Sequence, residues 1–69
     1  MSEHVYRVTE LVGTSQESIE DAIRTGIARA NQTVRNIDWF EVTEIRGYVR
    51  EGQLNHYQVG MKLGFKLED

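Results

Sequence analysis

The clearest pattern in the chain is a strict alternation of apolar and other residues between Asn55 and Leu67. Its apolar members are Tyr57, Val59, Met61, Leu63, Phe65 and Leu67. Because successive side chains of a strand point to opposite faces, this run predicts a β-strand with one face on a core. The opposite face carries Gln58 and two glycines, Gly60 and Gly64. Such a face suits a flat aromatic ligand or another subunit better than it suits water.

Two further elements are predicted ahead of this strand. The stretch from Val5 to Val12 is rich in β-branched and aromatic residues, which indicates a first strand. Apolar residues then recur at the spacing of an amphipathic helix that lies on a sheet: Ile19, Ala22, Ile23, Gly26, Ile27, Ala30 and Val34. Thr14 and Glu17 have the form of a capping box, and Ser15 is the alternative N-cap. With Asn36 at its end, the helix would have about twenty residues and a length of roughly 30 Å.

The segment from Asp38 to Tyr48 is predicted to form a second strand, joined to the third by a two-residue turn at Glu51-Gly52. This turn makes the numbers of facing residues sum to about 103, so Trp39 is expected to face Gly64. The side of the second strand that faces the helix would hold Phe40, Val42 and Arg46. The outer side, shared with Gln58, would hold Trp39, Glu41, Thr43 and Ile45.

These elements define the predicted topology. A right-handed crossover through the helix leaves the first and second strands parallel, with room for the third strand between them. We therefore expect an α+β fold, in which a β-α-β-β subunit wraps a three-stranded antiparallel-type sheet of order 1-3-2 on one long helix. Residues 1–69 are expected to form a single domain.

The size of the chain favours an assembly. A domain this short buries only about 60% of the surface that its unfolded chain exposes. The sequence has no cysteine, and its two histidines show no zinc-type spacing, so oligomerisation is the remaining means of stabilisation. In the predicted register Gln58 lies six residues from the partner of Trp39, roughly 20 Å away. If both residues bind one ligand, they must come from different subunits.

Charge and composition exclude several classes of partner. Eleven acidic and eight basic residues give a net charge of −3, and the basic residues are spread along the chain, so nucleic acid is not expected to bind. No stretch is long enough to span a membrane. The start Met-Ser-Glu-His lacks the features of a signal peptide, and the absence of cysteine is typical of intracellular proteins, so we expect a cytoplasmic location.

Five segments together carry a family pattern that spans nearly the whole chain: Glu10–Ser15, Asp38–Val42, Glu44–Gly47, Tyr57–Val59 and Gly64–Glu68. In these segments the sequence resembles the dodecins, a family of small flavin-binding proteins. The resemblance implies a homododecamer that forms a hollow shell and holds flavins in pairs at subunit interfaces. It also implies that Trp39 stacks on the isoalloxazine ring and that Gln58 hydrogen-bonds the polar edge of this ring. Coenzyme A is a further potential partner.

The resemblance also places basic side chains near the phosphate of FMN, at Arg46 and Lys66. Lys66 lies on the predicted outer face with Gln58, whereas Arg46 would reach a phosphate only past the sheet edge or in a neighbouring subunit. A lysine is a point charge where close relatives carry the bidentate fork of an arginine, which weakens the preference for a phosphate. Riboflavin therefore remains an alternative to FMN.

Without the resemblance, Trp39 would be assigned to core or interface packing and Gln58 to a solvated strand. No nucleophile, base and orienting group can be assembled from the sequence, so no catalytic residue and no metal ligand is predicted. The predicted function is storage of FMN or riboflavin and protection of the flavin from light, without turnover. The alternatives are a structural shell that binds no flavin and a flavin-dependent enzyme.

Overall fold

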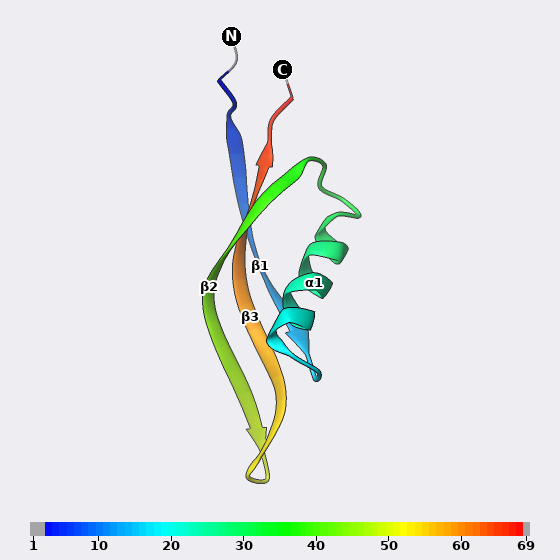
Figure 1. Cartoon of the computed structure of the whole chain (residues 1–69), viewed down its shortest axis with the longest axis vertical. Coiled ribbons are helices and arrows are strands. Elements are labelled where there is room, and N and C mark those ends of the chain that lie inside the picture. Colours follow the sequence, from blue (N-terminus) through cyan, green and yellow to red (C-terminus); the bar gives the residue numbers. More distant parts are fainter. Residues whose placement is uncertain (1–2, 69) are drawn as a thin grey trace.

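Three long strands and one helix follow one another in the order β-α-β-β (Figure 1). They are β1 (Tyr6–Ser15), α1 (Ile19–Ala30), β2 (Ile37–Arg50) and β3 (Gln53–Lys66). The computed structural model describes residues 3–68, so part of the Met-Ser-Glu-His start lies outside the described residues. β3 is the central strand and pairs antiparallel with both β1 and β2, giving the order β1-β3-β2. The predicted α+β fold class and strand order are confirmed.

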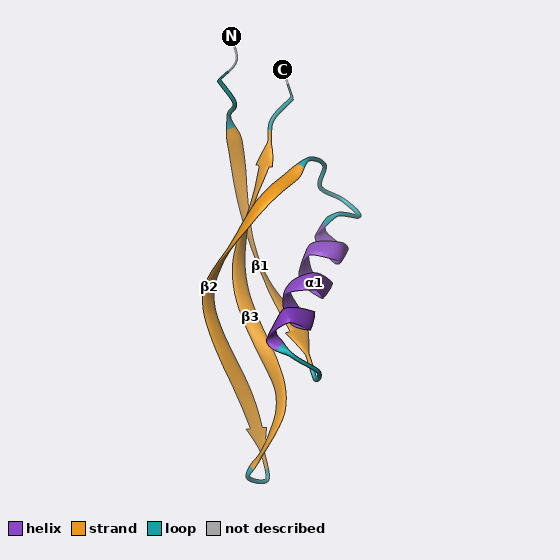
Figure 2. Ribbon diagram, in the orientation of Figure 1, coloured by secondary structure: helices purple, strands orange, loops and turns teal. Residues whose placement is uncertain are grey.

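The alternation in β3 determines where the core lies. Val59, Met61 and Leu63 are almost fully buried, and they form one core cluster with Ala22 of the helix. α1 lies over β1 and β3 on one side of the sheet, and we call this side the inner face and the opposite side the outer face (Figure 2). Because the helix does not extend over β2, the inner-face residues Phe40 and Ile45 of that strand are about half exposed, at 47% and 52%.

The helix is shorter than predicted and begins later. β1 continues to Ser15, so neither Thr14 nor Ser15 can be the N-cap, and that prediction was wrong. Ser18 is the N-cap, and its Oγ accepts a hydrogen bond of 2.9 Å from the backbone N–H of Asp21. The buried Ser15 instead builds the turn: its Oγ accepts from the N–H groups of Glu17 and Ser18 and donates to Asp21 Oδ2.

The C-terminal end of the helix also differs from the prediction. α1 ends at Ala30, with Asn31 as the C-cap. Val34 continued the apolar spacing, but its N–H donates to the Ala30 carbonyl from a turn beyond the helix. Asn36, predicted as the helix end, has a φ of 63° and directs the chain into β2. An asparagine tolerates this left-handed conformation better than most residues do.

Close contact between the helix and β1 depends on a glycine in each element. A Cβ atom at Gly13 would collide with the backbone carbonyl of Ala22. A Cβ atom at Gly26 would lie 2.9 Å from Leu11 Cδ1. The helix therefore rests directly on the backbone of β1.

The hairpin between β2 and β3 turns at Glu51 and Gly52, as predicted. Both residues have positive φ angles, 53° and 76°, as a two-residue turn of this kind requires. The predicted register holds from Trp39 to Val42, where Trp39 pairs with Gly64. It holds again beside the turn, where Val49 pairs with Leu54. Between these two stretches, the pairing of β2 residues 44–48 with β3 is displaced by one position. The hairpin extends well beyond the start of the helix (Figure 1).

Two β-bulges cause this displacement. Thr43 is the extra residue of β2 between the pairs formed by Val42 and Glu44, and Asn55 is the extra residue of β3 near the turn. A shift of one residue reverses the faces of the intervening side chains. Ile45, predicted on the outer face, therefore pairs with Val59 on the inner face, and that prediction was wrong.

Candidate functional site

The same bulge changes the position of a predicted site residue. Arg46 was expected on the helix side of the sheet, but it pairs directly with Gln58 on the outer face. The predicted placement on the helix side was therefore wrong, and with it the reason for expecting Arg46 to reach a phosphate only past the sheet edge or in a neighbouring subunit. The bulge at Thr43 turns Arg46 to the side that carries every other predicted site residue.

Trp39 lies flat against the outer face at one end of the sheet. A Cβ atom at its partner Gly64 would fall within the indole ring, so only glycine at this position leaves room for the indole. The side chain nevertheless remains 38% exposed. The indole thus has one face supported by the sheet and substantial surface available for stacking.

Tyr6 of β1 lies beside this indole, in the next row of the outer face. Its ring centroid lies 6.2 Å from that of Trp39, with an angle of 56° between the planes. Its hydroxyl donates a 2.9 Å hydrogen bond to Asp38 Oδ2, on the residue that precedes Trp39. This hydrogen bond, with lesser contributions from desolvation and the negative charge of Asp38, raises the pKa of Tyr6 above its ordinary value.

The predicted site residues form two groups on the outer face. The indole half-site comprises Trp39, Gly64, Tyr6 and Lys66, where Lys66 pairs with Tyr6 in the row next to Trp39. The amide half-site comprises Gln58, which is partly buried, and the exposed Arg46. Gln58 lies six residues from Gly64 along β3, roughly 20 Å away. One chain therefore does not bring Trp39 and Gln58 together.

Arg46 already has a partner within the chain. Its Nη2 donates to Glu44 Oε2 over 2.9 Å, and both side chains are more than half exposed. Glu44 faces Gly60, and its Cγ lies 3.1 Å from where a Cβ of Gly60 would be. Gly60 thus provides space for the stem of Glu44, as Gly64 does for the indole.

Sequence analysis did not single out an aromatic pair beside the amide half-site. Tyr48 and His56 face each other across β2 and β3, in the row next to Gln58. Their rings stack in parallel, with centroids 4.9 Å apart and an angle of 3°. The bulges place this pair on the outer face. The sequence indicates this arrangement only through Asn55, the extra residue at the bulge near the turn, because asparagine is depleted in regular strands.

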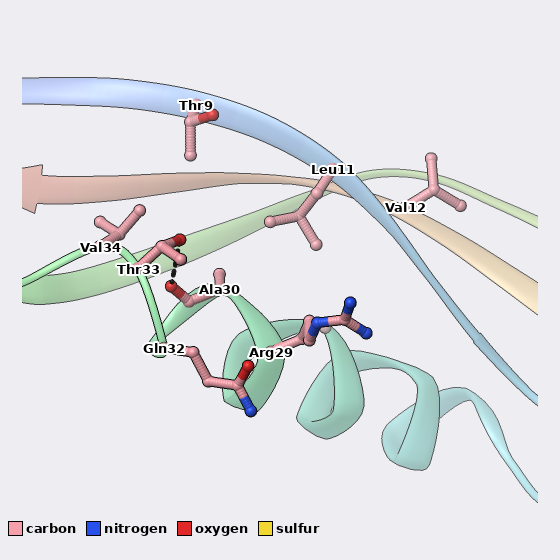
Figure 3. Close-up of a pocket in the computed structure, with 9 residues that line it drawn as sticks. Thr9, Leu11, Val12, Arg29, Ala30, Gln32, Thr33 and Val34 are labelled. Atoms are coloured by element: carbon pink, nitrogen blue, oxygen red, sulfur yellow. Dashed lines mark hydrogen bonds between the residues drawn. The ribbon is translucent and has the colours of Figure 1, made fainter.

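Two hollows among residues 3–68 lie apart from both half-sites. The larger, about 360 Å³, lies between β1 and the C-terminal part of α1, where Leu11 points toward the helix (Figure 3). A smaller one, about 220 Å³, lies over Gly60 and is bordered by Glu10, Val12 and Glu44. Neither Trp39 nor Gln58 lines either of these two hollows.

Residues 3–68 also bear on metal binding and on membrane insertion. This part of the chain contains no cluster of three or more His, Cys, Asp or Glu side chains arranged to hold a metal ion. Its one helix is too short and too polar to cross a membrane.

Comparison with known proteins gives consistent matches along the chain. Residues 5–68 match the family model described as Dodecin. The dodecin of Thermus thermophilus is 52% identical over 65 residues, which cover 94% of each chain. The structure of dodecin from Streptomyces coelicolor has a TM-score of 0.93 and 56% identity, covering 100% of this chain and 99% of that chain. Dodecin from Streptomyces davaonensis has a TM-score of 0.93 and 57% identity, covering 99% and 100%. This chain belongs to the dodecin family.

Proposed function

We propose that this protein binds a flavin, FMN or riboflavin, at interfaces between its subunits, and that it stores the flavin and protects it from light. The observation that carries the proposal is the position of Trp39. Its indole lies on Gly64, beside Tyr6, and keeps 38% of its surface exposed on an open sheet face. An aromatic side chain fixed in this way is suited to stack on a flat ring.

The two half-sites match the chemistry of a flavin. Stacking on the indole contributes about 0.5–1.5 kcal/mol beyond the area that it buries. The amide of Gln58 has both a donor and an acceptor, which suits a ring edge that alternates carbonyl and NH groups. Arg46 beside Gln58, and Lys66 beside the indole, are cations that can bind a phosphate.

The geometry of the single chain supports assembly. Because the half-sites are roughly 20 Å apart along β3, a single ring can contact both only if they come from different copies. Apolar side chains are exposed on both faces of the sheet, including Val8 and Val12 outside and Phe40 and Ile45 inside. Surfaces of this kind mark interaction sites. We propose a homododecamer, in keeping with the family.

We propose binding without turnover. A flavin enzyme needs an open site beside the reactive ring nitrogen and a group for proton transfer. A flavin stacked on Trp39 would leave little room for a substrate, and the indole can quench the excited flavin by electron donation. Steady-state oxidation of NADH by the flavin-loaded protein would contradict this part of the proposal.

The test is a fluorescence titration of ligand-free protein with FMN and with riboflavin, accompanied by light scattering. Strong quenching at about one flavin per chain supports the proposal, and a stable assembly that binds neither flavin overturns it. Trp39→Ala should abolish quenching and keep the assembly, because it removes the stacking partner. The matched control is Val8→Ala, which shortens an exposed apolar residue in the same row of the sheet. If Trp39→Ala dissociates the assembly, Trp39 has a structural role instead.

A further inference from the structure

Glu44 lies on the outer face between the two half-sites and is turned toward the amide half-site. Its stem lies over Gly60, and its carboxylate accepts a 2.9 Å hydrogen bond from Arg46 Nη2. Both residues lie directly after the bulge at Thr43, which places Glu44 opposite Gly60 and Arg46 opposite Gln58. The cation beside Gln58 is therefore presented together with a carboxylate.

The other charges on this part of the face do not offset that carboxylate. The nearest lysine, Lys62 of β3, lies in the next row of the sheet. It pairs with Glu10 of β1 on one side and with Glu41 of β2 on the other. A phosphate that approaches Arg46 must therefore share the guanidinium with Glu44 or displace it, and in both cases the phosphate remains near the Glu44 carboxylate.

We propose that Glu44 is a specificity-determining residue of the flavin site, one that lowers the affinity for FMN relative to riboflavin by competing with the phosphate for Arg46. The inference rests on the proposed function. Riboflavin has no phosphate, so the Glu44–Arg46 ion pair can remain intact when it binds. FMN has to share Arg46 with Glu44 or displace it, and its phosphate is repelled by the carboxylate in either case.

The size of the effect follows from the exposure of the pair. The side chains of Arg46 and Glu44 are 53% and 56% exposed, and an exposed ion pair is weak and screened by salt. A phosphate can therefore displace Glu44. Removing the carboxylate charge should tighten FMN binding by ~3- to 10-fold at low salt and change riboflavin binding less than ~2-fold.

The experiment compares the dissociation constants for FMN and riboflavin in the wild type, Glu44→Gln and Glu41→Gln, at low and high salt. Glu41 is the matched control because it is an exposed carboxylate on the same face that pairs with Lys62 and not with Arg46. We expect the ratio of riboflavin to FMN dissociation constants to rise in Glu44→Gln alone, and to rise less at high salt. In an Arg46→Gln background, Glu44→Gln should change this ratio much less.

Three results would overturn the inference: an unchanged ratio in Glu44→Gln, an equal rise in Glu41→Gln, or an equal effect of Glu44→Gln with and without Arg46. Riboflavin binding by the variants reports that the assembly and the indole half-site are intact. If the wild type binds riboflavin and the ratio does not respond, only the role of Glu44 is wrong. If the wild type binds neither flavin, the proposed function fails as well.

Discussion

At the scale of single residues, two glycines of β3 support functional side chains. Sequence analysis placed Gly60 and Gly64 on a face that suits a flat aromatic ligand or another subunit. In the structure the space above Gly64 is filled by the indole of Trp39, and the space above Gly60 by Glu44 and Thr43. The glycines therefore allow side chains of β2 to lie flat on the sheet, one in each part of the outer face.

Gly64→Ala should displace the indole, because a Cβ atom at this position would fall within the ring. Overpacking of this kind costs about 1–3 kcal/mol of unfolding free energy. Flavin quenching should also weaken, since the stacking surface is no longer held parallel to the sheet. Chemical denaturation and flavin titration measure the two effects.

Gly60→Ala is the matched control. Its Cβ atom would lie 3.1 Å from Glu44 Cγ, on a flexible and exposed side chain that can move away. We expect a smaller loss of stability and little change in riboflavin binding. Equal effects of the two substitutions would contradict the assigned roles and indicate a general cost of alanine in the central strand.

At the scale of elements, the features that depend on nearby residues could be predicted from the sequence, and those that depend on tertiary contacts could not. The alternation in β3 and the Glu51-Gly52 turn were sufficient to pair Trp39 with Gly64. The prediction succeeded because the extra residue Thr43 in β2 is offset by the extra residue Asn55 in β3, which restores the register. Only the segment between the bulges was assigned to the wrong face.

The position of Arg46 could not be predicted because a bulge depends on how the sheet twists and packs, and β-branched Thr43 is equally suited to a regular strand. The prediction of where the helix begins was wrong for a different reason. The segment from Thr14 to Ser18 contains several residues that can cap a helix, and the choice among them depends on how far β1 pairs with β3. That pairing is a tertiary contact, and no local pattern determines it.

The corrected helix start leads to a prediction at this scale. Ser18→Ala should lower the unfolding free energy by about 1 kcal/mol, because it removes the acceptor for the N–H of Asp21. Thr14→Ala, at the position first predicted to cap the helix, should have little effect, since Thr14 is an exposed β1 residue. Thermal and chemical denaturation of both variants measure the difference, and a larger loss in Thr14→Ala would restore the original assignment.

At the scale of the whole molecule, the single chain is too extended for a self-sufficient domain. Its radius of gyration is 14.4 Å, whereas a compact chain of this length has about 11 Å. Its accessible surface is 5362 Å², against about 4,450 Å² for a compact protein of 8.0 kDa. The excess arises where α1 does not cover β2 and where the hairpin extends beyond the helix (Figures 1 and 2). Contacts with other copies would remove this surface from water.

The uncovered inner side of β2 provides the last prediction. Phe40 is 47% exposed and pairs with the fully buried Leu63, so it extends the core toward the surface of the single chain. In an assembly we expect a second copy to cover it. Phe40→Lys should then yield smaller species in light scattering and reduced flavin quenching at micromolar protein concentration, because a buried charge without a partner is costly.

The neighbouring substitution Glu41→Lys is its control, since it introduces the same side chain on the outer face of the same strand. If the assembly depends on the uncovered inner side, Glu41→Lys should keep its mass while Phe40→Lys does not. An unchanged mass in Phe40→Lys would mean that the inner side of β2 faces water in the assembly. The excess apolar surface would then have to be buried through the outer face and the hairpin, where Val8, Val12 and Val49 are exposed.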